Sequence, residues 1–193
     1  MNKYVSVLGL ALTIALPHAA QAQSVTPPPV PTGIEVPAGN QAFLIGHGDG
    51  SQNYVCSQGK SLGQVVWTLF TPQATLFNDD GGQLTSHFFS PNPHEIGTPV
   101  RATWRDSQDT STVWAKANAT AVVDPTAVAW VLLEVVGREV GPTGGATLFG
   151  TTFVQRVNTI GGLAPTTGCD TPADLGKKAF QPYTADYVFY KKN

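Results

Sequence analysis

Residues 128–136 read VAWVLLEVV and form the most apolar stretch of the body of the chain. Taken with a period of two, both faces of this stretch are apolar, and Glu134 is the one interruption. A strand of this kind is covered on both sides by other parts of the protein. Because an unpaired carboxylate is costly in such surroundings, we expect Glu134 to lie at the strand end or to have a partner. The stretch therefore predicts a buried β-strand.

Shorter segments of strand character lie on either side of it, separated by turns rich in Gly, Pro, Asn and Asp. Residues 183–190 alternate between an aromatic face and a more polar face, which is typical of a half-buried strand. The segments around Asn-Asp-Asp-Gly-Gly at 78–82 form a hairpin signal. Together these patterns predict an all-β, single-domain antiparallel β-sandwich or barrel. The eleven candidate strands are 43–45, 52–56, 65–70, 74–77, 83–89, 100–104, 112–116, 119–123, 128–136, 148–157 and 183–190.

Helix signals are almost absent. Thr171 is a suitable N-cap, Pro172 suits the first helical position, and Asp174 stands where it can close a capping box. Gly176 follows shortly afterwards, so the sequence predicts about one helical turn near Thr171.

The chain begins with the features of an export signal. Lys3 precedes an apolar run over 5–16, and Ala-Gln-Ala at 20–22 offers small residues where a signal peptidase cleaves. The run is too short to span a bilayer. We expect residues 1–22 to be a signal peptide, 23–37 to be a Pro-rich lead that is extended and partly mobile, and 38–193 to form a single β domain, secreted or periplasmic.

The composition restricts the partners. Only 12% of the residues are charged, and the formal net charge is −2. A small negative charge provides no electrostatic attraction for nucleic acid, and no later apolar run is long enough for a membrane span. We therefore expect no nucleic acid and no membrane span, and we assign no cofactor. A small molecule, a glycan or a protein remains open as the partner.

Cys56 and Cys169 are the two cysteines of the sequence. In an exported protein, one intramolecular disulfide is the expected state of such a pair. A reactive thiol is the alternative, which export disfavours. The sequence thus predicts a bond between the segment at 52–56 and the loop before the last strand.

One long run carries a family resemblance. Residues 149–165 read FGTTFVQRVNTIGGLAP, and Cys169 and PYTADY at 182–187 follow. The chain resembles the secreted bacterial and fungal domain-of-unknown-function 3455 family over about residues 34–190. This resemblance implies one coherent exported fold and carries no settled activity. The earlier segments that fit it are VPAG at 36–39, YVC at 54–56, Trp67 and LTSHF at 84–88.

The histidines are the first candidates for a site. His47 and Asp49 lie in Gly-His-Gly-Asp-Gly at 46–50, which we interpret as a flexible turn where a ligand can approach the backbone. The alternative is an ordinary turn with a solvated histidine. His87 can be combined with His94 and Glu95 into a metal site, but the spacing matches no standard motif, and we assign no metal ligands.

Two tryptophans and one arginine complete the candidates. Trp104 and Trp114 lie in more polar segments, either exposed for stacking on a ligand or packed across one hairpin. Arg156 interrupts an apolar strand, and we expect it to pair with Glu134 or Asp186, because a buried charge normally has a partner. A structural ion pair and a ligand-orienting pair remain open.

These observations favour an exported, non-catalytic binding or structural module. We expect His47, His87 and one of the two tryptophans to share a surface region; the alternative is that they scatter. The other function considered is a small secreted hydrolase or metal-dependent enzyme using His47, His87 and nearby carboxylates. No catalytic residue is assigned. The candidate ligand-binding residues are His47, Asp49, His87, Trp104, Trp114 and Arg156.

Overall fold

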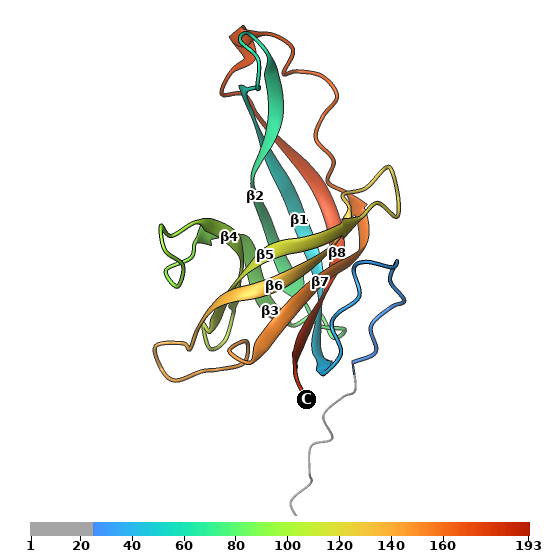
Figure 1. Cartoon of the computed structure of the whole chain (residues 1–193), viewed down its shortest axis with the longest axis vertical. Helices are drawn as coiled ribbons and strands as arrows, with labels where there is room; N and C mark the ends of the chain where they lie inside the picture. Colours follow the sequence, from blue (N-terminus) through green and yellow to red (C-terminus); the bar gives the residue numbers. More distant parts are fainter. Residues whose placement is uncertain (1–24) are drawn as a thin grey trace, which may run out of the picture.

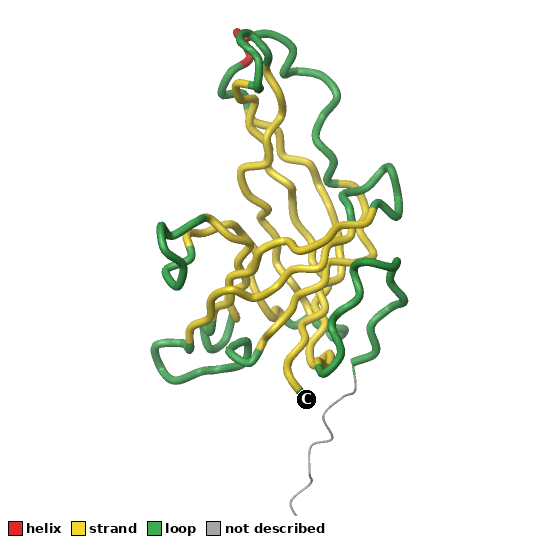
Figure 2. Tube along the Cα trace, viewed as in Figure 1, coloured by secondary structure: helices red, strands yellow, loops and turns green. Residues whose placement is uncertain are grey.

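The computed structural model describes residues 25–193, so the expected signal peptide lies outside the described residues. Over this range eight antiparallel strands each pair with the next, and β8 returns to pair with β1, which closes a barrel (Figures 1 and 2). The predicted all-β antiparallel fold is confirmed, in its barrel form. The strands are β1 (Asn40–Gln58), β2 (Val65–Phe77), β3 (Gln83–Pro91), β4 (Val100–Asp106), β5 (Thr112–Ala121), β6 (Trp130–Glu139), β7 (Thr151–Gly161) and β8 (Lys178–Lys192).

The predicted helical turn is also confirmed. It is a 3-10 turn, η1 (Pro172–Asp174), and the Asp174 carboxylate accepts a hydrogen bond from the Thr171 backbone N–H at 2.9 Å. Across residues 25–193, no helix has the length and apolar character needed to cross a membrane.

The stretch 46–50, expected to be a turn, is instead the middle of β1. Its glycines at 46, 48 and 50 recur with a period of two and face the barrel interior. A Cβ atom on Gly46 would lie 3.0 Å from Leu76 Cβ, and one on Gly48 would lie 3.0 Å from the Tyr187 ring. One on Gly50 would overlap the Gln73 backbone. Gly46 and Gly48 make room for side chains of the neighbouring strands, and Gly50 makes room for the β2 backbone, rather than bending the chain.

Two other predicted breaks also fail to end a strand. Pro72 lies inside β2, where the ladder to β3 has not yet begun, since that ladder starts at Ala74. On the β3 side the proline stands at an open edge, where its lack of an N–H is tolerated, while on the other side it faces Gln52 of β1. Near Ala117, β5 continues through a register shift against β6, so the two expected segments are one strand with a bulge.

The barrel interior is largely apolar. The inward face of β8 carries Tyr183, Ala185, Tyr187 and Phe189, as its alternation predicts, and all four lie in the main core cluster. From β6 the same cluster takes Val131, Leu133 and Val135. This packed interior is the main source of hydrophobic stabilisation for the fold.

The Pro-rich lead packs against the outside of the barrel. Val25, Val30 and Val36 contact a second cluster, which is built from residues of β1, β7 and β8. The Ile34 side chain is buried, and its carbonyl accepts a hydrogen bond from Gln155 Nε2 at 2.6 Å. The described part of the lead therefore covers the wall, and this is why neighbouring strands are apolar on both faces.

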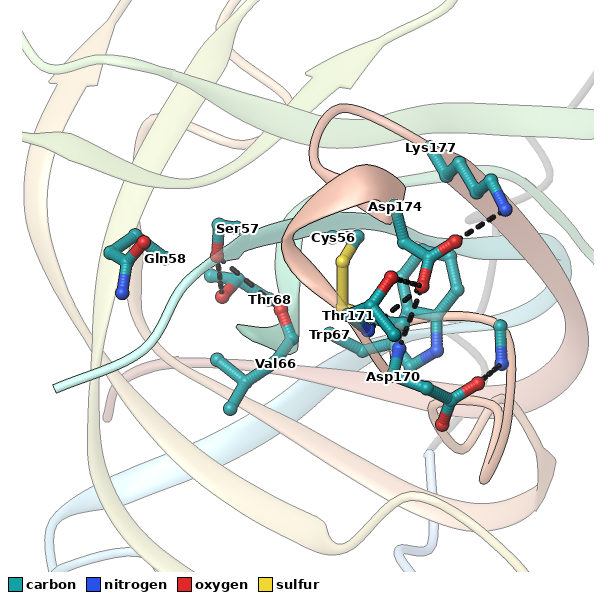
Figure 3. Close-up of a disulfide and its surroundings, with 12 residues drawn as sticks. Cys56, Ser57, Gln58, Val66, Trp67, Thr68, Asp170, Thr171, Asp174 and Lys177 are labelled. Carbon is teal, nitrogen blue, oxygen red and sulfur yellow. Dashed lines mark hydrogen bonds and ion pairs between the residues drawn. A yellow bond between two sulfur atoms is a disulfide. The ribbon is translucent and has the colours of Figure 1, made fainter. Parts of the chain in front are cut away.

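The strands β1, β2 and β8 extend beyond the barrel at one end, and η1 lies at the tip of this extension (Figures 1 and 2). The predicted disulfide between Cys56 and Cys169 is confirmed, with 5.4 Å between the Cα atoms. Figure 3 shows it beside Trp67, Thr171 and Asp174. It joins the end of β1 to the loop before β8, and it indicates an oxidising environment.

Candidate ligand-binding cavity

A cavity of about 470 Å³ occupies the barrel interior at the end from which β1, β2 and β8 extend. All eight strands contribute to its lining. The rim includes Val100, which is largely exposed, so the cavity opens to solvent there. The volume is within the usual range for small-molecule sites. Most of the wall is apolar, from Leu69, Pro72, Phe89, Val100, Ala102, Ala115, Ala117, Val131 and Leu133.

His87 lies in the cavity wall and is buried. Its Nδ1–H donates to the Thr103 carbonyl oxygen at 2.9 Å, and its ring stacks on Trp104 with 4.3 Å between centroids. Burial lowers the pKa of His87 to about 3, so the imidazole is neutral at ordinary pH. Because Nδ1 carries the proton, Nε2 is left as a hydrogen-bond acceptor.

Arg156 also faces the interior. It lies opposite Val131 and Tyr187 on the neighbouring strands, and both of these side chains belong to the interior core. Its Nη2 and Nε donate to the Ala129 carbonyl oxygen at 2.8 and 3.2 Å. Among residues 25–193 no carboxylate forms an ion pair with it. Residues 1–24 contain no Asp or Glu, so no acidic side chain there can provide one either.

The expected pairing of Arg156 with Glu134 or Asp186 is therefore wrong. Glu134 instead faces Lys116, with 3.3 Å between the charged atoms, and Asp186 faces His47. The reason is strand alternation, because Glu134 and Asp186 neighbour inward-facing residues and so point outward. Arg156 is separated from both carboxylates by the barrel wall.

Further polar groups complete the inner wall. The Tyr183 and Tyr187 hydroxyls lie 3.0 Å apart. Burial raises the pKa of both phenols, so both stay protonated. Gln52 is 1% exposed, and its Nε2 has no hydrogen-bond partner in the described structure. The Trp104 Nε1 group is likewise buried and without a partner there.

His47 lies on the outer surface of the barrel. Its Nδ1 is 2.7 Å from Asp186 Oδ1, and its Nε2 is 2.8 Å from Asp79 Oδ1. The hydrogen bonds to Asp186 and then Asp79 raise the pKa of His47. Both ring nitrogens face carboxylates, so this geometry suits the imidazolium. Asp49 is exposed on the same strand and shares a second, open hollow with His87, between β1, β2 and β3.

The two tryptophans lie on opposite sides of the wall. Trp104 is 0% exposed in the interior, and Trp114 is 6% exposed on the outer face. The Trp114 Nε1–H donates to Ser90 Oγ at 2.8 Å, and its ring lies near His94. Both alternatives given for these rings are therefore wrong. Neither ring is exposed, and the two do not pack across the hairpin, because Trp104 faces Val113 in the register and Trp114 faces Thr103, on the other side of the wall.

The predicted candidates thus divide into two groups. His87, Trp104 and Arg156 line the cavity, whereas His47, Asp49 and Trp114 lie outside it. The prediction that His47 and His87 share a surface region with one of the tryptophans is therefore wrong. His94 faces Glu139 and Glu95 binds Arg101, so they do not converge with His87. Within residues 25–193, no three His, Cys, Asp or Glu side chains are grouped so as to hold a metal ion.

Sequence reasoning missed three polar residues of the inner wall, Gln52, Tyr183 and Tyr187. The alternation over 183–190 placed both tyrosines on one face, but it gave no sign that a cavity lies beside them. The sequence did not indicate that Gln52 faces the interior, because the expected turn at 46–50 separated it from the alternation of the rest of β1.

Comparison with known proteins identifies the family. No curated protein matches the chain, and no solved structure matches it. One family model, described as protein of unknown function (DUF3455), matches residues 37–191. This match covers all eight barrel strands except the terminal residue of β8. The chain is therefore a member of the DUF3455 family.

Proposed function

We propose that this protein is an exported, non-catalytic module that binds a small molecule inside its barrel. The observation that carries the proposal is the open cavity of about 470 Å³, with a largely apolar wall and a few convergent polar groups. Closed barrels of about eight strands are wide enough to hold one small ligand. The disulfide and the export features of residues 1–22 support a secreted or periplasmic location.

The cavity wall also supports binding rather than catalysis. Its lining contains no Asp, Glu, Ser, Thr or Cys, so within the cavity His87 has neither a carboxylate nor a Ser, Thr or Cys nucleophile beside it. A nucleophile–base pair within hydrogen-bond reach is the usual signature of acyl-transfer chemistry. The hydrolase alternative required His47 and His87 to act together, and the barrel wall separates them.

The test uses N-phenyl-1-naphthylamine, a neutral apolar probe that fluoresces in dry sites. We expect saturable binding to the protein without residues 1–22. Ala102→Trp should abolish it, because Ala102 lines the cavity. The matched control is Arg105→Trp, which places the same ring at an exposed position on the same strand and should leave binding unchanged. Equal probe binding by both variants would overturn the proposal.

A further inference from the structure

The charge inside the cavity is not neutralised by the protein. Three cationic side chains line it, and two of them face carboxylates outside: Arg101 binds Glu95, and Lys116 faces Glu134. Arg156 has only uncharged partners among residues 25–193: it donates to the Ala129 carbonyl oxygen, and it also interacts with the Tyr187 hydroxyl. A partly buried guanidinium without a counter-ion is costly, so the site is favourable for a negative group brought by a ligand.

The uncharged polar groups of the wall point to the same ligand. Gln52 Nε2 and Trp104 Nε1 are buried donors without partners in the described structure. Arg156 has five N–H groups, and its hydrogen bonds to Ala129 occupy only some of them. Buried donors in native structures normally have acceptors. The wall thus offers unused donors, and the ligand should supply acceptor oxygens.

The rest of the wall limits the ligand to one with an apolar body. Leu69, Phe89, Val131 and Leu133 line the space around these donors. We propose that the cavity binds an organic anion, a carboxylate carried on an apolar group, with Arg156 as the residue that binds the carboxylate. This inference rests on the proposed function, because it names the ligand class of the same cavity.

The experiment compares two competitors of the neutral probe that have nearly the same shape, one an anion that only accepts hydrogen bonds and the other a neutral amide. Naphthalene-2-carboxylate should displace N-phenyl-1-naphthylamine at least about tenfold more effectively than naphthalene-2-carboxamide. Arg156→Met should remove this preference while the probe still binds. Arg105→Met removes an exposed charge from the outer wall and should keep the preference. Arg156→Lys, which keeps the charge but not the paired donors, should be intermediate.

The variant should remain folded, because removing Arg156 leaves no buried carboxylate without a partner. Urea unfolding of Arg156→Met, followed by the fluorescence of the tryptophans, checks this. If both competitors displace the probe equally, or if Arg156→Met retains the preference, the inference is wrong although the cavity still binds. If the probe itself does not enter, the proposed function fails instead.

Discussion

His47 and His87 lie on opposite faces of the same barrel wall, and their surroundings differ in every respect that matters to an imidazole. His47 is on the outside, partly exposed, with a carboxylate at each ring nitrogen. His87 is inside, stacked on Trp104, with one carbonyl oxygen as its partner. The pKa of His47 is raised and that of His87 is lowered to about 3.

This difference shows that in a closed barrel the protonation state and the partners of a side chain depend on whether it faces inward or outward. Adjacent residues of one strand face water and core in turn. His47 stands between two inward-facing glycines, and Arg156 stands between outward-facing Gln155 and Val157, which pack beneath the lead. The barrel wall therefore keeps Arg156 on the inside apart from Glu134 and Asp186 on the outside.

The largest expected effect concerns acid unfolding through His87. Between pH 6.5 and about 3 the unfolded chain binds a proton at this residue and the folded protein does not. The contribution of neutral His87 to stability is thus complete above pH 6.5 and is lost as the pH falls toward 3. The total loss is on the order of 5 kcal/mol, of which about 3 kcal/mol falls above pH 4. Urea unfolding between pH 7.5 and 4 measures that part.

His87→Gln is the matched control, because glutamine can still donate to the Thr103 carbonyl and does not titrate. We expect the free energy of unfolding of this variant to fall less steeply below pH 6.5 than that of the parent. Nitrogen NMR of the parent at pH 5 should show a neutral ring protonated at Nδ1. Parallel pH profiles, or an imidazolium signal at pH 5, would contradict the buried, neutral state.

Much of the fold follows from the sequence because alternation and hairpin turns are local signals. Residues 183–190 show which side chains face inward, and the two cysteines in an exported chain predict their own bond. Glycine was misleading, because one residue type serves both turns and close packing. The distinction lies in spacing: glycines at 46, 48 and 50 occupy one face of a strand, which a turn does not require.

The site was less predictable than the fold. Arg156 is a candidate because a charged residue in an apolar strand is unusual, and His87 is one because an imidazole can bind a ligand or a metal. Their real neighbours come from other strands, so no local pattern contains them. The pairing of Arg156 with Glu134 failed for this reason, since sequence alone did not relate the alternation of β6 to that of β7.

A substitution on β1 tests directly whether neighbouring residues face opposite sides of the wall. Its expected effect on the free energy of unfolding is smaller than that of His87. In Gly50→Ala the new methyl group would overlap the backbone of Gln73 and Ala74, so the strands must separate. We expect a loss of roughly 1–3 kcal/mol in the free energy of unfolding. Asp49→Ala, one residue away and exposed, should change it by less than about 0.5 kcal/mol. Equal losses in denaturant unfolding would show that the two positions do not face opposite sides.

The smallest effect is expected at His47, where solvent screens the ion pairs. The His47 side chain is 43% exposed and that of Asp79 is 82% exposed, so the two carboxylates together should contribute only about 0.5 kcal/mol. Because the folded pKa is raised, this contribution is complete below pH 6.5 and is lost as the pH rises through the folded pKa. His47→Gln should therefore be less stable than the parent at pH 5.5 and nearly as stable at pH 9. The titration of His87 cancels in this difference, since both proteins contain it. A deficit that grows with pH would mean that His47 is neutral in the folded protein, and the contrast between the two faces of the wall would then not hold.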